Sequence, residues 1–131
     1  MRTAMTAERR RKERISARKG AIAFSDRRYG QIIDASLDGL CFQYYTSISK
    51  TTDRNVQEDR GKGKLDIVFG AFDFFLVSLP VATVADFQVS LLDTGKSRQI
   101  IRRRVLSFGK ITAEQLFRLK RFLLLNRYGA I

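Results

Sequence analysis

Residues 29–45 read Tyr-Gly-Gln-Ile-Ile-Asp-Ala-Ser-Leu-Asp-Gly-Leu-Cys-Phe-Gln-Tyr-Tyr, two apolar runs separated by a short polar turn. Both runs are rich in β-branched and aromatic residues, which favour strands. The pair Asp38-Gly39 between them is typical of hairpin turns. The segment therefore predicts a β-hairpin.

Other short apolar runs bounded by turn residues lie on both sides of this hairpin. With the hairpin's own two runs, the predicted strands are Ala21 to Phe24, Tyr29 to Ile33, Leu40 to Tyr45, Leu65 to Phe69, Phe72 to Leu79, Thr83 to Leu92 and Gln99 to Phe108. Many strands at such short spacing indicate a mainly β fold, either a closed barrel or a sandwich.

The last part of the chain has a helical pattern instead. Thr112 followed three residues later by Gln115 is a capping-box signature for a helix start. From there apolar residues recur at three- and four-residue spacing, at Leu116, Leu119 and Leu123. The pattern predicts an amphipathic helix over 112–126.

The 131 residues fit one domain, with three parts. We expect a flexible basic arm over 1–19, a β-rich body over 20–110 and the terminal helix. Within the body, the polar segment 46–64 has few large apolar residues and is predicted to be a long loop.

The composition excludes several classes of function. The chain has no His, which removes the usual general base and metal ligand of neutral-pH enzymes, and its single Cys cannot form an internal disulfide. We therefore expect neither catalysis nor a metal or cofactor. The notable uncharged stretch, Phe74 to Ala85, has twelve residues, too few for a membrane span. We expect a cytoplasmic protein.

The charge of the chain points to an anionic partner. The net charge is +12, and residues 1–28 alone account for +7 of it. The run from Arg9 to Arg14 contains Arg10-x-x-x-Arg14. Guanidinium groups match phosphate oxygens bidentately and can pair with the O6 and N7 edge of guanine. The alternative interpretation is a solvated basic tail that touches any polyanion.

The turn of the central hairpin contains a second candidate motif, Asp34-x-Ser36-x-x-Gly39. Such residues can simply build a turn through side-chain bonds to nearby backbone. The functional interpretation uses the same residues. A carboxylate accepts from the N1 and N2 donors of guanine, a hydroxyl donates or accepts, and a glycine lets a base approach the backbone.

Together and in this order, the two motifs resemble those of the PilZ domain family, receptors for the bacterial second messenger cyclic di-GMP. The resemblance extends over most of the chain and implies a six-stranded antiparallel β-barrel with a C-terminal helix and a flexible basic N-terminal arm. It assigns ligand binding to Arg10, Arg14, Asp34, Ser36 and Gly39. Arg9 matches a further arginine of members that bind two stacked ligand molecules, so one or two ligands per chain remain open.

The function implied is that of a receptor without catalytic activity. Ligand binding would order the N-terminal arm and so relay the signal to a downstream protein, as yet unidentified. The alternative from composition is a basic β-barrel that binds nucleic acid, because the same arginines and aromatic residues would serve single strands.

Overall fold

A computed structural model describes residues 13–47 and 61–129 of the chain. The elements in chain order are β1 (Ile15–Ser16), β2 (Ala21–Ser25), β3 (Arg28–Ala35), β4 (Gly39–Ser47), β5 (Lys62–Phe69), the short 3₁₀ turn η1 (Gly70–Phe72), β6 (Phe74–Asp93), β7 (Arg98–Phe108) and α3 (Ala113–Tyr128). The strands are antiparallel to their neighbours throughout.

Six of these strands form a closed ring. The order β3-β2-β5-β6-β7-β4 is closed by pairing of β3 with β4, and β1 adds a short seventh strand against β3. Closure creates one interior, whose apolar core contains residues such as Ile32, Phe42 and Leu65. The prediction of a mainly β, six-stranded antiparallel barrel with a C-terminal helix is confirmed.

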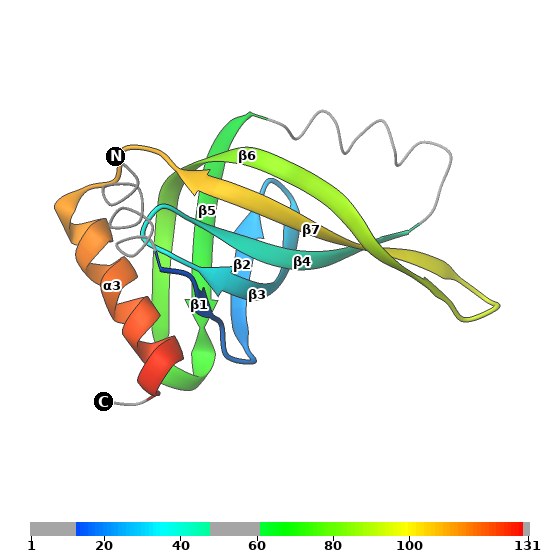
Figure 1. Cartoon of the computed structure of the whole chain (residues 1–131), viewed down its shortest axis with the longest axis horizontal. Helices are drawn as coiled ribbons and strands as arrows, with labels where there is room; N and C mark the ends of the chain where they lie inside the picture. Colours follow the sequence, from blue (N-terminus) through cyan, green and yellow to red (C-terminus); the bar gives the residue numbers. More distant parts are fainter. Residues whose placement is uncertain (1–12, 48–60, 130–131) are drawn as a thin grey trace, which may run out of the picture.

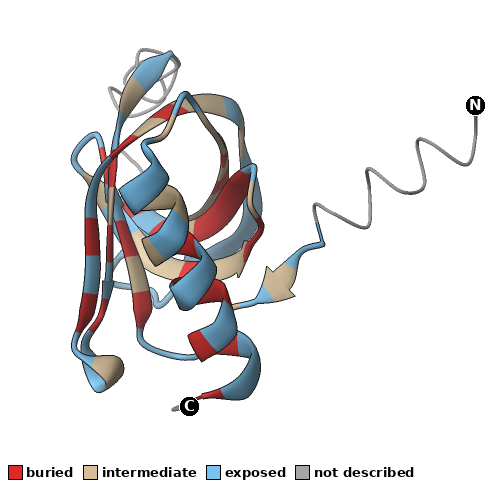
Figure 2. Ribbon diagram, turned by 90° about the vertical axis from the view of Figure 1, so that its left-hand side faces the viewer, coloured by how far each residue is buried: buried red, intermediate tan, exposed pale blue. Residues whose placement is uncertain are grey.

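The helix α3 lies across one end of the ring (Figures 1 and 2). Its start is the predicted capping box, because Gln115 N donates to Thr112 Oγ1 (3.1 Å) while Gln115 Oε1 accepts from Thr112 N (3.0 Å). Its buried face inserts Phe122 against Phe69 and Phe74, with ring centroids 6.0 and 5.6 Å apart. The helix continues to Tyr128, a little beyond the predicted end.

The strand pattern differs from the prediction at Pro80. The two strands predicted at 72–79 and 83–92 are wrong, because one strand, β6, runs unbroken from Phe74 to Asp93. The Pro80 carbonyl accepts from Gly109 N (2.7 Å) on the side towards β7, and the regular β6–β7 pairing begins only at Val81. Pro80 also pairs with Lys64 of β5, but the position of its missing N–H lies on the side of its carbonyl, towards β7 and just outside the β6–β7 ladder, where no donor is needed.

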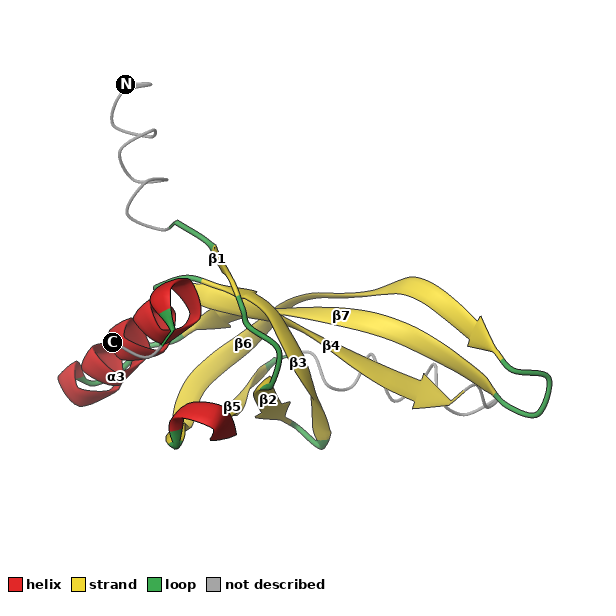
Figure 3. Cartoon of the chain, turned by 90° about the horizontal axis from the view of Figure 1, so that it is seen from below, coloured by secondary structure: helices red, strands yellow, loops and turns green. Residues whose placement is uncertain are grey.

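The second half of β6 leaves the barrel with β7. Pairing with β5 ends at Ala82, whereas pairing with β7 continues to Asp93. As a result, the second half of β6 and the first half of β7 project away from α3, with β4 still paired to β7 as far as Ser47 (Figures 1 and 3).

The predicted boundaries of the arm and the loop also need correction. Residues 13–19 of the predicted arm are held in place: β1 pairs with β3, and Ala17 N donates to Ile33 O (2.9 Å). At the predicted loop 46–64, β4 extends to Ser47 and β5 begins at Lys62. Residues 1–12 and 48–60 lie outside the described part of the chain.

Candidate functional site

The Asp34-x-Ser36-x-x-Gly39 motif forms the tight connection between β3 and β4. Ser36 N donates to Gly39 O (2.8 Å), and Asp38 N donates to Ser36 Oγ (3.3 Å). The Ser36 hydroxyl in turn donates to the carboxylate of Asp38. These bonds satisfy the turn internally, in the way that Ser and Asp side chains commonly do.

Two of the three motif residues are needed by the fold itself. Ser36 is fully buried, and Gly39 lies where β4 passes close to β7. A Cβ atom at Gly39 would stand 2.2 Å from the carbonyl oxygen of Leu106, so no larger residue fits without a backbone shift. Gly39 thus admits the neighbouring strand, and its predicted role of admitting a base stays a prediction.

Asp34 is different, because its side chain faces outward. It makes an ion pair with Arg14, whose Nε donates to Asp34 Oδ1 (2.9 Å) and whose terminal nitrogen bonds the same oxygen. The Arg14 and Asp34 side chains are 46% and 31% exposed. The two motifs, twenty residues apart in sequence, therefore meet at the barrel surface through an ion pair that solvent or a ligand can reach.

The backbone around Arg14 is fixed by β3. Ile15 pairs with Ala35 and Ser16 pairs with Asp34, so the strand places Arg14 beside the end of β3. Of the other predicted site residues, Ser36 and Gly39 adjoin this pair, and Arg9 and Arg10 lie outside the described residues.

The helix also holds this segment, through a contact that the sequence analysis missed. Asn126 is buried on the apolar face of α3. Its Oδ1 accepts from Arg18 N (2.7 Å), and its backbone oxygen accepts from Arg18 Nε (2.9 Å). Glu13 bonds Arg127 in the next position of the helix. An Asn four residues after Phe122 on an otherwise apolar face was the available sequence signal.

Charged groups of both signs surround Cys41 beside the β3–β4 turn. Cys41 in β4 lies directly across from Asp34 in β3. Burial raises the pKa of the Cys41 thiol, the Asp34 carboxylate raises it further, and the guanidinium groups of Arg103 and Arg14 lower it. A ligand at this position would meet one carboxylate and two cations.

A second charged cluster lies inside the barrel. Asp86 in β6 accepts from Arg102 Nε (2.6 Å), Arg104 Nε (2.8 Å) and the Tyr44 hydroxyl (2.5 Å). The side chains of Asp86 and Arg104 are 2% and 0% exposed. The arginines Arg102 to Arg104 do not lie on an edge strand, because β7 pairs with β4 and β6 on its two sides.

The pKa values in this cluster follow from its contacts. Burial alone would raise the pKa of Asp86, but hydrogen bonds from Tyr44, Arg102 and Arg104 outweigh burial and hold that pKa below its ordinary value. Burial and the bond to Asp86 raise the pKa of Tyr44 to about 12. At neutral pH the cluster therefore contains a charged Asp86 and a neutral Tyr44.

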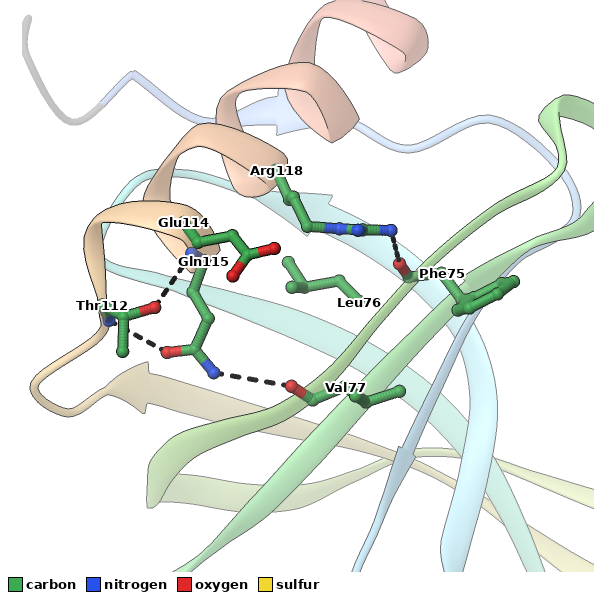
Figure 4. A pocket seen from close by; sticks show the side chains of 7 residues that line it. All are labelled: Phe75, Leu76, Val77, Thr112, Glu114, Gln115 and Arg118. Carbon is green, nitrogen blue, oxygen red and sulfur yellow. Dashed lines mark hydrogen bonds between the residues drawn. The ribbon is translucent and has the colours of Figure 1, made fainter.

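A separate hollow of about 290 Å³ lies between the start of α3 and β6. Figure 4 shows Arg118 and Gln115 reaching from the helix to the backbone of β6, where Arg118 Nη2 donates to Phe75 O (2.6 Å). Gln115 Nε2 donates to Ser78 O (3.2 Å). These polar groups attach the helix to the barrel wall.

Neither a metal cluster nor a helix that could span a membrane is found in the described part of the chain. Within residues 13–47 and 61–129 no three His, Cys, Asp or Glu side chains lie together as metal ligands would. The helices in those ranges are too short or too polar to cross a bilayer.

Comparison with solved structures decides the fold. The PilZ domain of YcgR from Escherichia coli, solved with c-di-GMP, superposes with a TM-score of 0.62 at 16% identity over 91% of this chain and 92% of that one. The chain has the fold of a PilZ domain. The Borreliella burgdorferi PlzA protein, solved in complex with c-di-GMP, matches at a TM-score of 0.50 and 14% identity over 96% of this chain. This PilZ-like chain spans 55% of PlzA.

Sequence comparison alone does not reveal this likeness. No protein-family model matches the PilZ-like chain, and no curated protein matches it by sequence. The resemblance that the sequence analysis drew from two short motifs therefore agrees with the fold.

Proposed function

We propose that this PilZ-like domain binds cyclic di-GMP at the surface where Arg14 and Asp34 meet. The observation that supports the proposal is their ion pair, which joins the basic arm to the β3–β4 turn. A receptor that reads guanine and phosphate together needs a carboxylate and an arginine at one exposed point, and this contact supplies both.

The ligand would replace the ion pair by a larger set of contacts. The Asp34 carboxylate accepts from N1 and N2 of a guanine, and the released Arg14 guanidinium binds a phosphate oxygen or a second base edge. Breaking the pair costs little, because an exposed ion pair contributes about 0 to 1 kcal/mol. Arg9 and Arg10 are proposed to add further contacts from the arm, and Ser36 and Gly39 to shape the turn.

The proposed output is ordering of the N-terminal arm, which changes the surface presented to a downstream protein. Fixing a residue costs about 1 to 2 kcal/mol, which a multiply charged ligand bridging arm and barrel can offset. In this proposal the protein acts as a receptor and has no catalytic activity. Because residues 13–19 are already held by β3 and α3, the backbone NMR signals of residues 6–12 are the ones that should change their mobility at ligand saturation; unchanged signals would refute this output.

Calorimetry with cyclic di-GMP tests the binding itself. We expect saturable binding by the full chain, with one or two ligands, and a loss of about tenfold or more in affinity for Arg14→Ala and for Asp34→Asn. The matched controls are Arg98→Ala and Asp93→Asn, because Asp93 and Arg98 form an exposed aspartate–arginine pair elsewhere on the surface. No heat from a folded protein would contradict the proposal.

The same experiment separates the receptor from a nucleic-acid-binding protein. Affinity for single-stranded RNA or DNA should fall steeply as salt rises and should depend little on sequence. Tight binding of many oligonucleotides without binding of the cyclic dinucleotide would favour the nucleic-acid alternative.

A further inference from the structure

The outer face of the barrel beside the Arg14–Asp34 pair carries a third charged residue, Arg103. In the register of the sheet, Arg103 in β7 lies directly across from Gln43 in β4 and from Phe87 in β6. Residues paired in this way share one face of the sheet. Gln43, Arg103 and Phe87 therefore form a row across three strands.

This row is next to the row that contains Asp34. Asp34 pairs with Cys41, and Cys41 pairs with Val105. On β4, Cys41 is two residues from Gln43, and on β7, Val105 is two residues from Arg103, so the two rows lie next to each other on the same face. Adjacent strands are about 4.8 Å apart, so β7 lies about 10 Å from β3 across the face. A base held at Asp34 and lying over Cys41 would reach the neighbourhood of Arg103.

Two observations fix the orientation of the Arg103 side chain, one on the inner and one on the outer face of β7. Its neighbours Arg102 and Arg104 point inward and bind Asp86, so alternation directs Arg103 outward. On the outer face, Arg103 Nε donates to Gln43 Oε1 (3.2 Å). Within residues 13–47 and 61–129 no hydrogen bond occupies its two terminal amino groups. Arg103 is partly exposed, and its guanidinium is thus held at Nε while the two terminal amino groups stay available to a ligand.

We propose that Arg103 is a second contact for the ligand and donates both terminal N–H groups to the O6 and N7 edge of a guanine. This inference rests on the function proposed above. Arginine paired with O6 and N7 of guanine is the commonest specific contact of this base, because the two donors match the two acceptors. Gln43 acts as a positioning residue that sets the plane of the guanidinium.

The surroundings favour a base over a phosphate at this position. Phe87 is 44% exposed directly across from Arg103 and offers an aromatic surface on which a base can stack. A phosphate site would gather several cations or backbone N–H groups, whereas this row holds one cation between an amide and a ring.

Calorimetry with Arg103→Gln and Arg103→Lys tests the inference. We expect each variant to bind cyclic di-GMP about tenfold more weakly, since a bidentate pair is worth about 1 to 3 kcal/mol and 1.4 kcal/mol is a factor of ten. The lysine variant keeps the charge but loses the fork. Full affinity in Arg103→Lys would overturn the bidentate contact. The control is Arg98→Gln on the same strand, with affinity within about twofold of the natural chain.

A base analogue identifies the atom that Arg103 contacts. A cyclic dinucleotide of 7-deazaguanosine lacks N7, so Arg103→Gln should weaken its binding by less than about threefold. An equal loss with both ligands would show that Arg103 does not contact N7 and would refute the assignment.

The two proposals fail in distinguishable ways. If the natural chain binds no cyclic di-GMP, the proposed function fails and the inference fails with it. If the chain binds and depends on Arg14 and Asp34, but Arg103→Gln binds as well as the natural chain and unfolds at the same temperature, the inference alone is wrong.

Discussion

Replacement of Asp86 by Asn should destabilise the barrel more than any exposed charge change. Asp86 is 2% exposed and accepts hydrogen bonds from Tyr44, Arg102 and Arg104. The amide removes the negative charge and turns one acceptor into a donor that faces other donors. Because Arg104 is fully buried, its charge would lose the carboxylate of Asp86 in a place that water does not reach.

The expected loss is about 3 to 5 kcal/mol, the usual cost of removing one partner from a buried ion pair. For 131 residues the entropy of unfolding is about 0.28 kcal/mol per kelvin, so a loss of 4 kcal/mol lowers the melting temperature by about 15 °C. Urea denaturation is the appropriate measurement, because it does not screen charges as a guanidinium salt does.

The matched control is Asp93→Asn at the last residue of the same strand. Its carboxylate pairs with Arg98 at 3.4 Å, and both side chains are more than half exposed. We expect that variant to lose about 0 to 1 kcal/mol. If Asp86→Asn cost no more than Asp93→Asn, the reasoning about the buried cluster would be wrong.

The same variant has a pH signature. The folded pKa of Asp86 lies below its ordinary value of 3.8. The stabilisation that this depression contributes is therefore complete above pH 3.8 and is lost as the pH falls through the lower, folded pKa. Below pH 3.8 the urea midpoint of the natural chain should fall more steeply than that of Asp86→Asn; parallel curves would contradict the assignment.

Three further predictions concern other parts of the fold. Because the folded pKa of Tyr44 is about 12, against 10.0 ordinarily, the stability that it contributes should be lost between pH 10 and 12, and a tyrosinate absorbance titration should lose its latest component in Tyr44→Phe. Gly39→Ala should cost more than about 1 kcal/mol in urea denaturation, because the new Cβ would meet Leu106 O, whereas Gly70→Ala, with open space around it, should cost less; equal midpoints would refute the packing argument. Thr112→Ala should remove the helix cap and cost about 1 kcal/mol by the same measurement, and an unchanged midpoint would show that the capping box does not stabilise α3.

Local sequence signals predicted most elements of the fold. The alternation in the strands and the Thr112–Gln115 pair depend on neighbouring residues, so they can be read along the chain. Pro80 misled the prediction for the opposite reason. Whether a strand tolerates proline depends on where its neighbour's ladder begins, and that is a property of the sheet.

The candidate site was predictable in part. Matching both motifs to one family brought Arg14 and Asp34 together before any contact was known. The buried role of Asp86 was not predictable from its own surroundings in sequence, because its partners come from β4 and β7. In the sequence, Arg103 is only the middle residue of an arginine triplet. Its position in the row next to Asp34 depends on the register of three strands, β3, β4 and β7.

The burial of Ser36 and Gly39 has a consequence for how this motif tolerates mutation. Both residues serve the turn and the close approach of β4 to β7, so a descendant that no longer needed its ligand would still be selected to keep them. Asp34 and Arg14 form only an exposed pair and would be free to drift. In distant relatives of this fold, the survival of the serine and glycine therefore reports an intact barrel, whereas the acid and the arginine can be lost without harm to the barrel.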